Sequence, residues 1–153
     1  MITEKSDLFP HWIVLCMIVS SLLAYLFVCH YFGHQLFAVL PEENRLVIRT
    51  VFYALTIVAF PITNLIRYVQ LRLNQTMPGN QSAKNRYLVT VIVSMILIES
   101  VGLMGLIIFM LGDDYNTLYI FTGLSALGVY LYRPKQEEYS QIVRAMAERN
   151  EKR

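Results

Sequence analysis

Four long apolar runs divide this chain of 153 residues, and each is long enough to cross a lipid bilayer. A hydrocarbon core of about 30 Å needs roughly 20 helical residues, because each residue adds about 1.5 Å. The runs lie at residues 12–32, 47–68, 87–111 and 115–132. The sequence therefore predicts an all-α fold, in which four transmembrane helices form a bundle of two antiparallel hairpins over residues 1–132.

The composition agrees with a membrane protein, since 56% of the residues are hydrophobic and only 16% are charged. That balance is too apolar for an ordinary soluble domain. The fourth run is the shortest and contains Gly123 and Gly128, so a chain with three spans is the alternative. Tyrosines at both of its ends favour the four-span interpretation, because such rings prefer the membrane interface.

The first run is longer than the apolar region of a typical secretory signal, and no cleavage site of the A-x-A type follows it. We therefore expect this run to be a retained membrane anchor. The chain also begins without the Arg- and Ser-rich leader of an organellar protein. These features favour the inner membrane of a bacterium as its location.

Basic residues are concentrated on one side of the predicted membrane domain. The connection between the second and third runs contains no acidic residue, and its basic residues are Arg67, Arg72, Lys84 and Arg86. The tail at 133–153 is also rich in Lys and Arg. The positive-inside rule therefore predicts both termini in the cytoplasm. This sorting explains the net charge of +2 better than nucleic-acid binding does, because no base-reading surface is evident.

The tail at 133–153 has the pattern of a short amphipathic helix. Acidic and basic side chains recur at helical spacing, and between them lies an apolar stripe formed by Tyr139, Ile142, Val143 and Met146. Such a stripe can dock on lipid headgroups or on another protein. Of the two interpretations, a solvated amphipathic end is the favoured one.

Glu99 is the one Asp, Glu, Lys or Arg residue that falls well inside an apolar run. It lies twelve residues beyond Tyr87, which corresponds to about 18 Å of helix. At that depth a carboxyl group must be protonated, hydrogen-bonded or in contact with water. It is either a proton or cation site, or a neutral acid bonded to a hydroxyl group. Matching depth indicates Tyr25, Thr56 and Thr122 as polar partners.

Small residues surround Glu99 on the third run. Gly102 lies three residues beyond Glu99 and so near the same helix face, and Gly105 and Ser94 are close by. Small side chains allow another helix backbone to approach closely in a membrane. We therefore expect Gly102, Gly105 and Ser94 to form a helix-packing surface beside the acid.

The stretch around Glu99 resembles the second helix of the rotor-ring proteolipid, subunit c, of ATP synthases. Its sequence is LIESVGLMGLI, in which a carboxylate at mid-membrane depth is followed by an apolar run with glycines, after a polar loop. The resemblance covers about 25 residues and implies that Glu99 matches the ion-carrying carboxylate of that family. The preceding span differs from rotor helices, because it carries Phe52, Tyr53 and Pro61 where they have alternating glycines.

His30 and His34 form a second candidate constellation, four residues apart at the end of the first run. That spacing places both imidazoles on one helix face, where they would suit a transition metal if Asp113 or Asp114 came near. The more common role of such interfacial histidines is contact with water or lipid headgroups. A metal-dependent membrane enzyme is thus a third hypothesis for this chain.

The sequence contains no motif of a known catalytic class, such as a nucleophile elbow, a phosphate-binding loop or paired carboxylates. It therefore favours a non-enzymatic role without a cofactor. The leading hypothesis is a small integral membrane protein that acts through helix–helix contacts, as an accessory subunit of a membrane complex or as a homo-oligomer. Its expected partners are the lipid bilayer and other membrane subunits or itself. The alternative is a proton- or cation-translocating element centred on Glu99.

Overall fold

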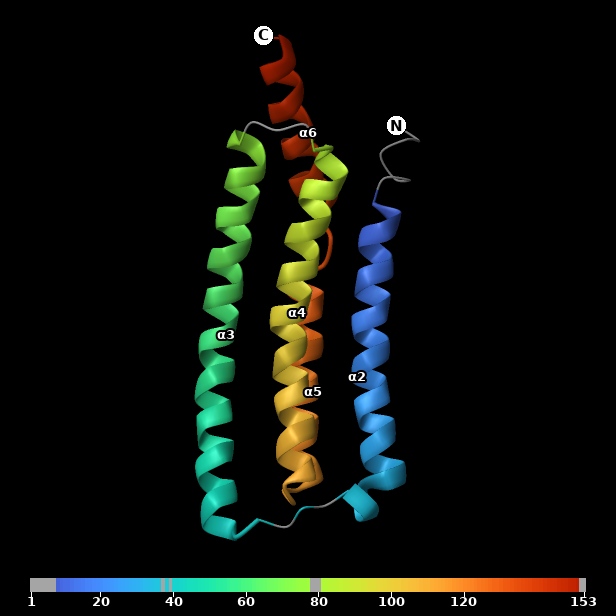
Figure 1. The fold of residues 1–153 in the computed structure, drawn as a ribbon, viewed down its shortest axis with the longest axis vertical. Helices are drawn as coiled ribbons and strands as arrows, with labels where there is room; N and C mark the ends of the chain where they lie inside the picture. The colour runs from blue at the N-terminus through green and yellow to red at the C-terminus, as the bar shows by residue number, and fades with distance from the viewer. Residues whose placement is uncertain (1–7, 37, 39, 78–80, 152–153) are drawn as a thin grey trace.

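The computed structural model describes residues 8–36, 38, 40–77 and 81–151. This part of the chain contains five helices and no strands, joined by short connections (Figure 1). The helices are α2 (Phe9–Leu36), α3 (Glu42–Thr76), α4 (Ala83–Met110), α5 (Tyr115–Leu131) and α6 (Gln136–Glu151). The prediction of an all-α fold is confirmed.

Among the described residues, three helices are long and apolar enough to cross a membrane. They are Phe9–Gly33 within α2, the whole of α3 and the whole of α4, and they coincide with the first three predicted runs. The fourth predicted run forms α5, whose 17 residues give a length of about 25 Å. That helix is therefore shorter than the hydrocarbon core of a typical bilayer, and it is the one predicted span that does not reach the expected length.

The helices form a bundle with α4 and α5 at its centre, flanked by α2 on one side and α3 on the other (Figure 1). α4 contacts each of the other four helices. We call the end of the bundle that carries α6 the α6 end, and the opposite end, where α4 turns into α5, the Asp113 end. The start of α2, the end of α3 and the start of α4 all lie at the α6 end (Figure 1).

The turn between α4 and α5 is short because its residues suit a sharp reversal of the chain. Gly112 adopts a φ of 93°, a conformation that side chains other than glycine rarely accept. Asp114 then caps α5, since its carboxylate accepts a hydrogen bond from the Thr117 backbone N–H at 2.9 Å. That bond lowers the pKa of the Asp114 carboxyl below its usual range.

Glycines bring α4 and α5 into close contact. A Cβ atom placed on Gly105 would lie 2.6 Å from the Cβ atom of Phe121, and one on Gly128 would lie 2.5 Å from Cγ2 of Ile98. Ser125 donates a hydrogen bond of 2.9 Å to the backbone carbonyl of Ile98, which joins the two helices in the same region. The glycines therefore permit a backbone separation that any larger residue would prevent.

α6 packs against the bundle through the predicted apolar stripe. Because Gly128 lies against Ile98, α5 ends near the middle of α4 and leaves the first part of α4 uncovered. α6 covers that part, and its Tyr139 and Ile142 are buried in one hydrophobic cluster with Tyr87. The stripe, for which the sequence favoured a solvated helix and left docking on lipid or another protein open, packs largely within the same chain.

Candidate functional site

Glu99 of α4 faces α2, where two hydroxyl groups contact the same carboxyl oxygen. Oε1 of Glu99 lies 2.6 Å from the Ser21 Oγ and 2.9 Å from the Tyr25 hydroxyl oxygen. Ser21 and Tyr25 are four residues apart on α2, so helical spacing places both side chains on the face that meets α4. Among the described residues, Ser21 and Tyr25 make the only polar contacts with the Glu99 side chain. We call Ser21, Tyr25 and Glu99 the Glu99 cluster.

The hydrogen bonds of the Glu99 cluster join α2 to α4. Ser21 Oγ lies 2.7 Å from the backbone carbonyl of Ile18 and 2.6 Å from Glu99, so its one proton is shared between these two acceptors. The Tyr25 hydroxyl donates to the same carboxyl oxygen. Two hydroxyl groups on one face of α2 therefore hold the carboxyl group of α4.

Of the three predicted partners of Glu99, the structure brings Tyr25 to the carboxyl and leaves Thr56 and Thr122 elsewhere. Thr56 lies on α3 and Thr122 on α5, whereas Glu99 faces α2. Both threonine hydroxyl oxygens are buried and hydrogen-bond no other described residue. Sequence reasoning missed Ser21, although its spacing from Tyr25 on the first run is the signal that identifies it.

The predicted packing surface beside Glu99 is occupied within the chain. A Cβ atom on Gly102 would lie 2.5 Å from Leu22 of α2, and Gly105 lies against Phe121 of α5. Ser94 is fully buried, and its hydroxyl donates to the Thr90 backbone carbonyl one turn earlier on the same helix. These small residues therefore pack α4 against its own neighbours, and this surface is closed to another subunit.

His30 is held by two neighbours at the Asp113 end. Its Nδ1 lies 3.0 Å from the Leu26 backbone carbonyl, and its Nε2 lies 2.9 Å from the Tyr119 hydroxyl oxygen. The described residues contain no group of three His, Cys, Asp or Glu side chains that could hold a metal ion. The side chain of His34 lies outside the described residues, so the metal site at His30 and His34 stays a prediction.

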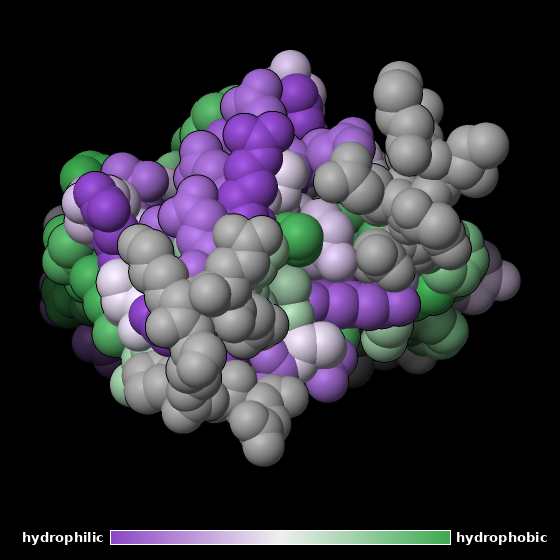
Figure 2. All heavy atoms as spheres, turned by 90° about the horizontal axis from the view of Figure 1, so that it is seen from above, coloured by the Kyte–Doolittle hydropathy of each residue, from purple (hydrophilic) through white to green (hydrophobic). Residues whose placement is uncertain are grey.

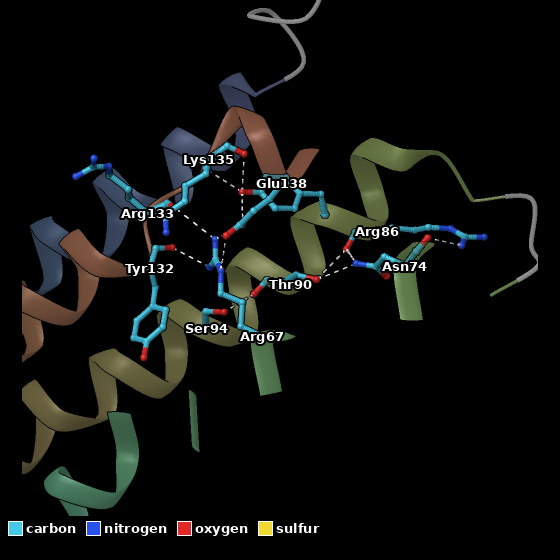
Figure 3. A network of polar contacts seen from close by, with 10 residues as sticks. Arg67, Asn74, Arg86, Thr90, Ser94, Tyr132, Arg133, Lys135 and Glu138 are labelled. Atoms are coloured by element: carbon cyan, nitrogen blue, oxygen red, sulfur yellow. Dashed lines mark hydrogen bonds and ion pairs between the residues drawn. The ribbon is translucent and has the colours of Figure 1, made fainter. Parts of the chain in front are cut away.

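A polar network at the α6 end fastens α6 to α3 and α4 (Figure 3). Arg67 is 4% exposed, and its Nη2 lies 2.6 Å from Oε2 of Glu138. The same guanidinium donates to the backbone carbonyls of Tyr132 at 2.8 Å and Arg133 at 3.3 Å. Tyr87 of α4 adds its hydroxyl, which lies 3.0 Å from Oε2 of Glu138. Arg67 was read from the sequence only as a charge that sets topology.

A second part of this network closes the connection between α3 and α4 (Figure 3). Asn74 donates to the Thr90 hydroxyl oxygen at 2.9 Å and to the Arg86 backbone carbonyl at 3.1 Å. Arg86 in turn donates to the backbone carbonyls of Asn74 and Met77 at the end of α3. Viewed from this end, hydrophilic residues gather over the middle of the molecule and hydrophobic ones lie at its sides (Figure 2).

The described sites thus offer hydrogen bonding and electrostatic attachment between helices. The Glu99 cluster joins α2 to α4, and the network at the α6 end can hold a helix in place. Comparison with protein-family models, with curated proteins and with solved structures finds no match to this chain, so its function must be argued from these sites.

Proposed function

We propose that this chain is a four-span membrane protein that acts through helix–helix contacts, and that its partner is a second copy of itself. The proposed location is a bacterial inner membrane with both termini in the cytoplasm. α5 is the fourth span in this proposal, because its outward residues Ile120, Leu127 and Leu131 are exposed and apolar. A span shorter than the bilayer can be accommodated by local thinning of the membrane.

The observation that carries the proposal is an apolar groove of about 360 Å³ between α2 and α5. Gly123 and Ala126 line the groove on the α5 side, and a Cβ atom placed on Gly123 would meet nothing within 4 Å. Thr122 also lines it, is 8% exposed, and has a hydroxyl that hydrogen-bonds no other described residue. A groove with small residues and a buried hydroxyl suits an incoming transmembrane helix.

The outward face of α5 is self-complementary, which favours a second copy over a foreign subunit. Tyr119, Gly123, Ala126 and Tyr130 recur at spacings of four, three and four residues, the pattern of a helix-packing seam. Small residues occupy the centre of this seam and tyrosines its two ends. Two identical helices can therefore cross closely at Gly123 and Ala126 around a two-fold axis.

Gly123→Leu is expected to separate assembly from folding. The leucine has open space in the monomer, so the variant should insert and unfold like the wild-type protein, whereas the added bulk blocks the crossing point. Intact-complex mass spectrometry of the protein purified in mild detergent measures the oligomeric state. Ala54→Leu on the exposed face of α3 is the matched control and should assemble normally. Gly102→Leu would be uninformative here, because Leu22 already fills that space.

Three outcomes of this measurement decide between the candidates. A wild-type dimer that Gly123→Leu converts to monomer supports the proposal. A wild-type monomer, or a dimer that survives Gly123→Leu, contradicts it. Foreign subunits in stoichiometric amounts would instead assign the chain an accessory role in a larger membrane complex.

Proton or cation translocation centred on Glu99 is the second candidate function, and the half-buried position of its side chain favours it. A carboxyl that exchanges protons must be accessible, and Glu99 is neither enclosed nor paired with a basic residue in the described structure. If Glu99 is a structural acid, Glu99→Gln should leave stability nearly unchanged, because the amide oxygen can take the place of Oε1 and accept from both Tyr25 and Ser21. Glu99→Leu should destabilise the protein by about 1–3 kcal/mol, since Tyr25 loses its acceptor and Ser21 keeps only the Ile18 carbonyl.

Thermal unfolding in detergent measures the stability of these two variants, and ion flux into proteoliposomes measures translocation. Glu99→Gln with unchanged flux removes the translocation hypothesis. A wild-type flux that Glu99→Gln abolishes, with folding intact, would establish it.

A further inference from the structure

A small pocket lies at the α6 end, between α3 and the joint that connects α5 to α6. Its volume is about 320 Å³, and Asn64, Tyr68 and Leu131 form part of its wall. Lys135 lies at its edge, and the buried ion pair of Arg67 and Glu138 also lines it. No role has been given to this pocket by the helix contacts described above.

The electrostatics of the pocket favour an anion. Arg67 and Glu138 compensate each other at 2.6 Å, so neither leaves an unbalanced charge. Lys135 is exposed, and its ammonium group has no carboxylate partner among the described residues. Arg133, two residues earlier, does not line the pocket, and its side chain extends away from the Arg67 network (Figure 3). The pocket edge is therefore positively charged.

The pocket lies where apolar side chains give way to charged ones on two different helices. On α3, exposed Leu65 is followed by Tyr68 and then by Arg72, whose guanidinium carbon lies 5.7 Å from the centre of the Tyr68 ring. On the α5 side, Arg133 lies 4.3 Å above the ring of Tyr130. Tyrosine rings paired with arginines in this order are typical of the level of lipid headgroups.

We propose that this pocket binds the headgroup of an anionic phospholipid. Lys135 would face the phosphate group, the Asn64 amide would donate to a headgroup oxygen, and Leu131 would contact the start of an acyl chain. Basic pockets between transmembrane helices are known sites for anionic lipid headgroups. The apolar wall below the charged edge favours a lipid over a free phosphate ion, because only the lipid has an apolar part that can contact this wall. This proposal is independent of the self-association through α5.

The test compares lipids that differ only in headgroup charge. The full-length protein in mild detergent is incubated with phosphatidylglycerol or with phosphatidylcholine of the same acyl chains, and bound lipid is counted by intact-protein mass spectrometry. We expect phosphatidylglycerol to be retained in preference to phosphatidylcholine. Lys135→Gln should reduce that retention about fivefold, the effect of one basic residue near an anionic surface. Arg144→Gln, an exposed basic residue elsewhere on α6, is the matched control and should retain the lipid.

Two further measurements make the result decisive. Asn64→Leu alters the pocket without changing charge and should also weaken retention, so the test does not depend on the folding of one variant. Inorganic phosphate, added in excess, should not displace the lipid. Equal retention of both lipids, equal effects of Lys135→Gln and Arg144→Gln, or displacement by inorganic phosphate would overturn the proposal.

Discussion

Replacing Arg67 with methionine is expected to destabilise the protein by about 3 kcal/mol and to release α6 from the bundle. The guanidinium is buried and donates to Glu138 and to the backbone carbonyls of Tyr132 and Arg133. Methionine fills a similar volume but donates nothing, so Glu138 would remain near the apolar interior without its counter-ion. Removing one partner of a buried ion pair lowers stability more than replacing both partners with apolar residues, because it leaves one buried charge unpaired. Thermal unfolding in detergent measures the loss, and tryptic cleavage after Arg144 reports the release of α6.

Two comparison variants make this expectation specific. Arg72→Met removes an exposed arginine from the same helix, and should change stability little, because its guanidinium interacts only with the Tyr68 side chain among the polar contacts of the described residues. The double variant with Arg67→Met and Glu138→Met should regain part of the loss, because no unpaired charge remains. If Arg72→Met and Arg67→Met were equally stable, the network would not hold α6 in place.

Gly105→Ala should destabilise the contact between α4 and α5 by about 1–3 kcal/mol, as overpacking does in a dense core. The added methyl carbon would lie 2.6 Å from the Cβ atom of Phe121. That atom is attached directly to the backbone of α5, so rotation of the phenyl ring cannot remove the clash. The two helices must therefore separate, which also disturbs the packing around Gly102 and Gly128. Thermal unfolding of the detergent-solubilised protein measures the change.

Gly123→Ala is the matched comparison for Gly105→Ala. Both positions are helical glycines, so the gain in helix propensity is similar at each and cancels in the difference. A Cβ atom at Gly123 meets nothing within 4 Å, and the monomer should therefore be as stable as the wild-type protein or more so. Equal stability of the two variants would show that α4 and α5 do not approach as closely as described.

The pattern of apolar and polar residues along the chain was sufficient to predict where its helices lie. It could not predict which helices pack against each other. Apolar runs and polar interruptions indicate helix positions, because the bilayer imposes a minimum length and excludes charges. α5 is the exception, since a run of that length can be a short span or a helix packed beside others. Whether α5 crosses the membrane depends on the thickness of the surrounding bilayer and not on the helix alone.

The Glu99 cluster illustrates the limit of reasoning from depth alone. Helical rise gave the correct level for Tyr25, and the same argument applied equally to Thr56 and Thr122. Depth is one coordinate, whereas a hydrogen bond also requires the right direction around the helix axis. That direction depends on which helix lies opposite Glu99, and the structure shows that it is α2.

The sequence by itself determined that this chain is helical and apolar enough for a membrane, and that Glu99 lies near the middle of a helix long and apolar enough to cross one. These properties follow from composition and periodicity along one dimension. Only the tertiary structure decided that the Gly102 and Gly105 surface is filled by Leu22 and Phe121, and that α6 packs back onto α4. The first outcome depends on which helices lie opposite α4, and the second on how far α5 extends along α4, because its early end exposes the apolar surface that α6 then covers.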